Sequence, residues 1–221
     1  MAKRTLQSAP RARSPIRQKA PVGDHAGWEV SRASGDTPLR LADLTPLTKV
    51  LVRADPESPT AARLSCQFGR SKRTDARELV LGSGPDEWLI LAPAGRELAA
   101  VARLATPEPA PETGEGELVS VIDVTHGRVV LRLSGKDAVA TLEKICAIDL
   151  SDLATPDGAV FCSSVARLTC VVARDDVDGL RSYLIVSDRS SGQYLFDVIA
   201  DAGAEFSLSV DGYPLRSSRL T

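Results

Sequence analysis

The stretch GPDEWLIL at residues 84–91 joins a turn signal directly to an apolar strand. Glycine permits a positive φ and proline fixes the neighbouring backbone angle, so the turn is encoded locally. A second apolar run, at residues 78–81, precedes it. The two runs therefore predict an antiparallel hairpin. Asp86 and Glu87 are adjacent, so on an extended strand they would point to opposite faces, which argues against an acid–base pair.

A second stretch, IDVTHGRVVLRLSG at residues 122–135, has the same organisation. Its turn, Thr125-His126-Gly127, predicts a hairpin between strands at residues 118–123 and 128–133. Along the second strand, apolar and polar side chains should separate by face. The expected dry face carries Val129, Leu131 and Leu133, and the mixed face carries Val130 and Arg132.

The rest of the chain alternates strand and helix signals. Strands are predicted at residues 48–52, 159–173 and 181–187, with an acidic hairpin tip at 174–179. Helices are predicted at 60–68 with Thr60 as cap, 95–105, 134–145 with Ser134 as cap, and 194–202 after a capping box from Ser190 to Gln193. Paired strands followed by a helix thus occur twice. This repetition predicts an α+β fold with antiparallel sheets rather than a doubly wound parallel sheet.

The predicted organisation has three parts. Residues 1–40 form a basic, proline-containing N-terminal arm, residues 41–206 an α+β domain with an acidic loop at 106–117, and residues 207–221 a C-terminal tail. Residues 1–20 contain six Lys or Arg and no acidic residue, so the segment is either an arm that orders on a partner or a mitochondrial presequence. Its prolines would interrupt an amphipathic helix, which favours the arm.

Composition excludes several classes of protein. The 221 residues carry a net charge of −2 and only 4% aromatic residues, which offers neither a basic field nor stacking platforms for nucleic acid. No apolar run approaches the ~20 residues that cross a bilayer. The cysteines have no CxxC spacing, so we expect reduced thiols in a cytoplasmic protein rather than a metal site. They are Cys66, Cys146, Cys162 and Cys170.

Two residues invite a catalytic interpretation. His126 lies near Asp123 and Arg128 in the sequence and could be a general base whose pKa these charges adjust. The turn position explains the histidine equally well, because histidine tolerates the unusual backbone angles of turns. Cys146 falls near the end of its predicted helix, where the dipole does not favour a thiolate. Trp88 lies among continuous apolar residues and is expected to be a core or interface anchor.

No nucleotide signature is present. The pair Gly82-x-Gly84 belongs to no G-x-G-x-x-G motif between a strand and a helix, and no phosphate-binding loop occurs. From the residues alone we therefore assign no catalytic, cofactor-binding or metal-binding residue.

Four segments resemble the gamma subunit of heterotetrameric sarcosine oxidase. In order and spacing they are RSPI at 13–16, GPDEWLIL at 84–91, VIDVTHGRVVLRLSG at 121–135 and KICAIDL at 144–150. The resemblance runs from about residue 13 to 206. It implies the folate-binding, aminomethyltransferase-like fold of the glycine-cleavage T-protein.

The resemblance also implies a function shared among subunits. The complex would oxidatively demethylate sarcosine to glycine and produce hydrogen peroxide and methylenetetrahydrofolate. FAD and FMN would lie on the beta subunit, and NAD and tetrahydrofolate on alpha. This chain would be a non-catalytic gamma subunit that contacts mainly alpha, with beta and delta completing the complex. The alternative is a stand-alone folate-binding protein of one-carbon transfer or repair with the same fold.

Overall fold

The structure, a computed structural model, describes residues 10–105 and 117–214. Residues 1–9 of the arm, 106–116 of the acidic loop and 215–221 of the tail lie outside the described residues. The larger of the two main sheets has the order β11 (Val160–Val165), β12 (Leu168–Arg174), β13 (Ser182–Asp188), β10 (Arg128–Ser134), β4 (Arg40–Asp43) and β14 (Ser209–Asp211).

The other described strands form two further sheets. The five-stranded sheet has the order β6 (Ser71–Arg73), β7 (Leu79–Gly84), β8 (Glu87–Ala92), β5 (Thr48–Arg53) and β9 (Ser120–Asp123), and the three-stranded sheet has β1 (Ala12–Arg13), β3 (Trp28–Ser31) and β2 (Val22–His25). The helices are α1 (Pro59–Leu64), α2 (Glu97–Ala105), α3 (Ala138–Glu143) and α4 (Gly192–Ala202), with short 3-10 turns at Arg189–Ser191 and Ala204–Phe206.

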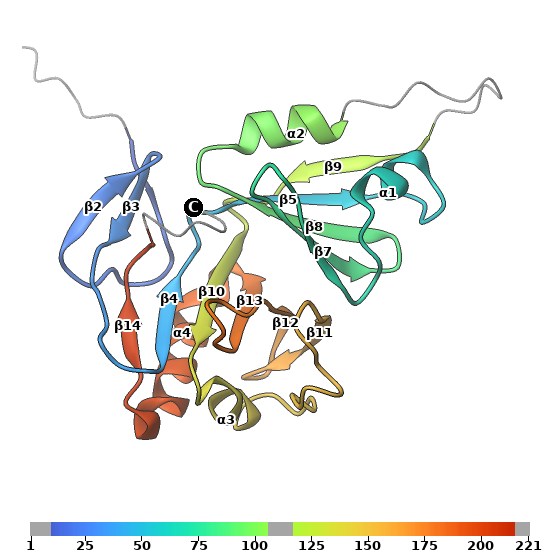
Figure 1. The fold of residues 1–221 in the computed structure, drawn as a ribbon. Coiled ribbons are helices and arrows are strands. Elements are labelled where there is room, and N and C mark those ends of the chain that lie inside the picture. The colour runs from blue at the N-terminus through green and yellow to red at the C-terminus, as the bar shows by residue number, and fades with distance from the viewer. Residues whose placement is uncertain (1–9, 106–116, 215–221) are drawn as a thin grey trace, which may run out of the picture.

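The two large sheets face each other, and helices cover their outer faces (Figure 1). Three apolar cores separate these layers: one under α3 and α4, one between the sheets, and one under α1 and α2. The three-stranded sheet contributes Trp28 and Val30 to the core between the sheets. This arrangement confirms the predicted α+β class with mainly antiparallel strands.

Strand β10 shows how alternation builds the layers. Val129, Leu131 and Leu133 belong to the core under α3 and α4, as predicted for the dry face. Val130 belongs to the core between the sheets. Each fully buried side chain of this size contributes about 1.5–3 kcal/mol, so a slip of one residue in register would be strongly unfavourable.

The hairpin predicted at 78–91 is confirmed by the pairing of β7 with β8, with a bulge between Gly82 and Gly84. Glycine at position 82 has a specific cause, because a Cβ there would lie 2.2 Å from the Gln67 carbonyl oxygen. That loop is held in place by backbone bonds, including Gly82 N–H to Arg70 O at 2.9 Å.

The hairpin predicted between 118–123 and 128–133 is wrong. β9 pairs with β5 in the five-stranded sheet, whereas β10 pairs with β13 and β4 in the other. The Thr125-His126-Gly127 turn therefore carries the chain from one sheet to the next. Two apolar runs around a turn have the local pattern of a hairpin. The crossing between the sheets depends instead on pairing with β5 and β13, which are distant in the sequence.

The single strand predicted at 159–173 is also wrong. It divides into β11 and β12, which pair with each other through a turn at Ala166 and Arg167. Both turn residues have positive φ, 50° and 67°, as in the tight turns that match strand twist. The acidic tip after β12 is confirmed, because β12 pairs with β13.

Three predicted helix caps differ from the structure. The hydroxyl of Ser58, not Thr60, accepts from Ala61 N at the start of α1. Asp137 rather than Ser134 precedes α3, without a side-chain bond. No side-chain cap begins α4 either, because the Gln193 amide oxygen instead accepts from Arg17 N at 2.7 Å.

Much of the N-terminal arm and the start of the tail are ordered within the chain itself. Residues 12–31 form the three-stranded sheet, and Ile16 is buried in the core under α4. β14 in the tail runs parallel to β4, with Val210 opposite Leu41. We expected the arm to order on a partner, but its strands already pair with one another here.

Candidate functional site

The site predicted around His126 does not assemble. The His126 ring stacks on Trp28, with centroids 4.9 Å apart and planes 13° from parallel. Asp123 accepts from the backbone N–H of Thr125 at 2.8 Å, and Arg128 pairs with Asp188 across the β10–β13 ladder. His126 is exposed, but its ring is held by the stack on Trp28 and its two charged neighbours are engaged elsewhere, so the general-base interpretation finds no support in this geometry.

The same junction contains a buried lysine that sequence reasoning missed. Lys49 is fully buried on β5, and its Nζ donates to the Thr45 carbonyl at 2.6 Å. The ammonium also lies 5.9 Å from the Trp28 ring centroid, within cation–π range. The only sequence signal was one lysine inside the otherwise apolar run that forms β5.

Burial dominates the electrostatics of Lys49. It lowers the pKa of the amine from 10.5 to about 7, against the opposing influence of the Asp43 carboxylate. A neutral amine is a nucleophile toward carbonyl compounds. However, none of the Lys49 surface is exposed, so a substrate could not reach Nζ in this conformation. Its geometry suits a structural role at the junction of the three sheets.

A shallow depression of about 800 Å³ lies beside α1 and the β7–β8 hairpin. Its lining includes Cys66, Phe68, Arg70 and Trp88. Trp88 is buried, and its Nε1 donates to the Cys66 carbonyl at 2.7 Å, which confirms its prediction as a core anchor. Burial raises the pKa of the Cys66 thiol, which disfavours the reactive thiolate.

The four cysteines are all free thiols, as predicted, and Cys66, Cys146 and Cys170 are buried. Cys162 differs, because it is exposed on β11. Its sulfur is nevertheless part-buried, 3.4 Å from the Ser83 carbonyl oxygen, and this partial desolvation raises the pKa of Cys162, as burial raises that of Cys170. Cys146 follows α3 and belongs to the core under that helix. These raised pKa values disfavour the thiolate at Cys66, Cys162 and Cys170.

The two carboxylates of the β7–β8 turn lie in different surroundings. Glu87 pairs with Arg53 on β5, with Nη2 and Oε2 separated by 2.6 Å, and accepts from Ser83. Asp86 is exposed in the turn. The Glu87 carboxylate is thus held by a neighbouring strand and by its own hairpin.

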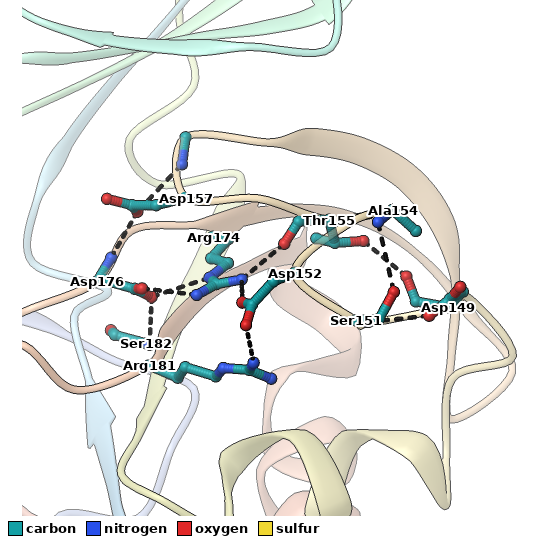
Figure 2. Close-up of polar contacts among 11 residues, drawn as sticks. Asp149, Ser151, Asp152, Ala154, Thr155, Asp157, Arg174, Asp176, Arg181 and Ser182 are labelled. Atoms are coloured by element: carbon teal, nitrogen blue, oxygen red, sulfur yellow. Dashed lines mark hydrogen bonds and ion pairs between the residues drawn. The ribbon is translucent and has the colours of Figure 1, made fainter.

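A network of charged and polar residues surrounds Arg174 (Figure 2). Arg174, buried at the end of β12, donates to Asp152 and Asp176 and to the Thr155 carbonyl at 2.8 Å. Asp152 Oδ2 also accepts a hydrogen bond from Arg181 Nη2 at 2.6 Å. The Asp176 hydrogen bond is the largest influence that raises the pKa of Arg174. This network ties the loop before β11 to the β12–β13 hairpin.

Asp175 connects the two large sheets. Its carboxylate accepts from Arg132 of β10 at 2.7 Å and also pairs with Arg73 of β6. Its side chain is only 7% exposed, so both ion pairs work at low local dielectric. The mixed face predicted for Arg132 therefore serves to bridge the sheets.

Within residues 10–105 and 117–214, no group of three or more His, Cys, Asp and Glu side chains is placed to hold a metal ion. In that same part of the chain, no helix has both the length and the apolar character to cross a membrane. The side-chain contacts described above hold the sheets, the arm and the loops together.

The sequence is similar to a known family. Residues 74–205 match the family model for the sarcosine oxidase gamma subunit. Sarcosine oxidase subunit gamma from Corynebacterium sp. (strain P-1) is 30% identical over 191 residues, which cover 83% of this chain and 89% of the relative. The corresponding subunit from Arthrobacter sp. is 29% identical over 193 residues.

Solved structures show the same fold. A chain of the heterotetrameric sarcosine oxidase from Corynebacterium sp. U-96 superimposes with a TM-score of 0.64 at 24% identity, covering 80% of this chain and 90% of that one. Aminomethyltransferase T of the glycine cleavage system from Bartonella henselae gives 0.66 at 16% identity, covering 87% of this chain and 56% of that one. By its sequence match and its fold, this chain belongs to the sarcosine oxidase gamma subunit family.

Proposed function

We propose that this chain is the non-catalytic gamma subunit of a heterotetrameric sarcosine oxidase. The observation that carries the proposal is the 30% identity to a gamma subunit across 89% of that relative's length. The site geometry supports it, because the candidate catalytic residues His126, Cys146 and Lys49 are each engaged in packing or fully buried. The chain's own contribution is then structural.

The reaction we propose belongs to the whole complex. Sarcosine is oxidatively demethylated to glycine, oxygen is reduced to hydrogen peroxide, and tetrahydrofolate takes the one-carbon unit as methylenetetrahydrofolate. The partners are the alpha, beta and delta subunits, with the main contact on alpha. FAD, FMN, NAD and tetrahydrofolate would reside on those subunits, in the cytoplasm.

The glycine pair of β7 does not fit the phosphate group of a flavin or a dinucleotide. The Gly82-x-Gly84 pair lies inside β7 and does not open a helix, where a phosphate would bind. The need for glycine at position 82 is explained by the chain's own Gln67 carbonyl. We therefore derive no catalytic step through a cofactor on this chain.

Co-expression with the other three subunits tests the proposal. We expect the tagged chain to co-purify with them and the complex to consume oxygen with sarcosine, whereas the purified chain alone is colourless and inactive. Mass identification of the co-eluting chains provides the second readout. Stoichiometric flavin on the isolated chain would overturn the proposal.

The fold shared with aminomethyltransferase T supports a second candidate, a stand-alone folate-binding protein. Calorimetry of the isolated chain with tetrahydrofolate separates the two candidates. Micromolar binding would favour the folate-binding protein, and absence of heat at the same concentrations would favour the structural subunit.

A further inference from the structure

The depression of about 800 Å³ beside α1 combines buried apolar residues with an exposed aromatic ring. Its lining residues Ala61, Cys66 and Trp88 are each buried, whereas Phe68, which also lines it, is 60% exposed. A phenyl ring that stays in water forgoes part of the stabilisation that burial provides. A molecule that fills the depression would remove this apolar surface from water.

The loop that carries Phe68 is fixed by the chain's own backbone. Gly69 N–H donates to Gly82 O at 3.0 Å, and Gly82 N–H donates to Arg70 O at 2.9 Å. These two bonds hold the loop against β7. The depression is therefore already formed in the isolated chain, which lowers the entropic cost of binding.

Two basic side chains, Arg70 and Lys72, line the same depression. Lys72 lies opposite Val80 in the β6–β7 pair, and Val80 belongs to the core under α1 and α2. Directly opposed residues share a face of the sheet, so Lys72 lies on the face that α1 covers. The next residue, Arg73, faces the other way and pairs with Asp175. Alternation along β6 thus directs one cation to the depression and the next to the other large sheet.

The charges of Arg70 and Lys72 are not compensated by an ion pair within residues 10–105 and 117–214. Both side chains are exposed. By contrast, Arg53, Arg73 and Arg103 each pair with a carboxylate. The two cations of the depression are therefore available to an anionic group that another molecule supplies.

Among the described residues that line the depression, Glu57 alone carries a carboxylate. It belongs to the turn before α1, whereas Arg70 and Lys72 come after that helix in the sequence. The lining thus holds two positive charges against one negative charge, in a chain whose net charge is −2. Charge complementarity favours a carboxylate beside Arg70 and Lys72.

We propose that this depression binds a segment of a neighbouring subunit of the sarcosine oxidase complex, which places an apolar side chain against Phe68 and an Asp or Glu beside Arg70 and Lys72; this inference rests on the proposed function. Apolar anchors bordered by charged groups are typical of interfaces between proteins. A small anion would neutralise the two cations but leave the Phe68 ring in water. A protein segment meets both requirements.

Substitutions in the depression test the proposal by competition during assembly. The other three subunits are co-expressed with equal amounts of wild-type chain and variant chain under different tags, and the ratio incorporated into the complex reports their relative affinity. Phe68→Ser and the double variant Arg70→Gln/Lys72→Gln should each be outcompeted by about tenfold or more. Thermal melting of the isolated variants shows whether each still folds.

Arg167→Gln is the matched control, because Arg167 is exposed in the turn between β11 and β12 of the other large sheet. It should enter the complex within about twofold of the wild-type chain. Salt separates the two parts of the interaction. The advantage of the wild-type chain over the double variant should shrink as NaCl rises from about 0.05 to 0.5 M, because exposed charges are screened. Its advantage over Phe68→Ser should persist.

A photoreactive benzoylphenylalanine in place of Phe68 identifies the occupant in the assembled complex. Mass spectrometry of the crosslinked peptide should find a segment of another subunit in which an Asp or Glu neighbours an apolar residue. A crosslink to residues 106–116 of this chain, to a second copy of it, or to a segment without a carboxylate would overturn the proposal. The proposed function would remain intact in each of these cases.

The remaining outcomes also distinguish the two proposals. Folded variants that enter the complex as often as the wild-type chain would show that the depression is not an interface, and so would an assembled complex without a crosslink at position 68. If the wild-type chain does not assemble with the other subunits at all, both proposals fail together.

Discussion

Arg132 and Asp175 form a buried ion pair in the core of the molecule, with Nη2 and Oδ2 separated by 2.7 Å and side chains that are 13% and 7% exposed. Arg73 reaches the same carboxylate from the five-stranded sheet. The two large sheets are therefore joined by charge as well as by apolar contacts.

Replacing Asp175 by Asn should destabilise the protein by about 3–5 kcal/mol, because Arg132, whose side chain is only 13% exposed, would lose its ion pair with the Asp175 carboxylate. Asp188→Asn is the control, since the Asp188 side chain is 69% exposed in its pair with Arg128 and should cost at most about 1 kcal/mol. Urea unfolding followed by circular dichroism measures both. Equal effects of the two substitutions would contradict the sheet-bridging role.

Lys49 predicts a pH dependence of stability. Its pKa is about 7 in the folded protein and 10.5 in the ordinary state, so between these values the unfolded chain binds more protons. The free energy of unfolding should then rise with pH from 7 to 9, by up to about 1.4 kcal/mol per pH unit from this group. Lys49→Met should lack this slope.

Lys72→Met is the control for that experiment, because Lys72 is exposed on β6 and should leave the slope unchanged. Chemical unfolding at several pH values gives the slopes directly. A Lys49→Met protein whose stability rises with pH as steeply as the wild type would show that Lys49 does not titrate in this range.

Trp88→Ala should destabilise the chain by about 3–5 kcal/mol, because it empties a buried aromatic site and removes the bond to the Cys66 carbonyl. Trp88→Phe keeps most of the buried ring and should lose about 1 kcal/mol. We expect the yield of assembled complex to fall while the Michaelis constant for sarcosine stays nearly constant. Normal assembly with a sharply altered Michaelis constant would place Trp88 at the substrate instead.

Gly82→Ala should cost about 1–3 kcal/mol, because the new Cβ would collide with the Gln67 backbone. At Gly127 the nearest atom to an added Cβ is 3.6 Å away, an ordinary contact, so Gly127→Ala serves as the tolerated control. Melting temperatures of the two variants decide the matter. The reverse order would mean that the 67–70 loop moves aside more easily than its backbone bonds indicate.

His126→Ala separates packing from catalysis. Loss of the stack on Trp28 should cost about 0.5–1.5 kcal/mol in stability. Turnover of the assembled complex with sarcosine should stay within about twofold of the wild type. A fall of about a hundredfold in turnover at normal assembly would restore the general-base interpretation.

Local signals allowed part of this fold to be predicted. The β7–β8 hairpin is specified by the glycine and proline of its own turn, and the alternation along β10 specifies which side chains face the helices. The crossing from β9 to β10 is not local, because it depends on partners in β5 and β13. The turn at Ala166 and Arg167 has no glycine, asparagine or proline, so nothing in those residues marks it.

In the candidate site, too, some features follow from the local sequence and others depend on residues distant in the sequence. Trp88 and the thiols of Cys66, Cys146 and Cys170 could be assigned to the interior from their apolar neighbours, whereas Cys162 is exposed. Lys49 could not, because a lysine in a strand normally reaches solvent, and only the three-sheet junction encloses this one. The capping box at Ser190 was misleading for a related reason: the Arg17 N–H, distant in sequence, takes the Gln193 side chain.

The place of β4 between β10 and β14 has a consequence for biosynthesis. Residues 40–43 leave the ribosome well before residues 131–134, and long before residues 209–211, with which they pair. Leu41, which has no exposed surface in the finished sheet, stays uncovered during that interval. The nascent chain therefore exposes apolar side chains and an unpaired strand until β10 and β14 have been synthesised. During that interval a chaperone or a partner subunit could protect it from aggregation.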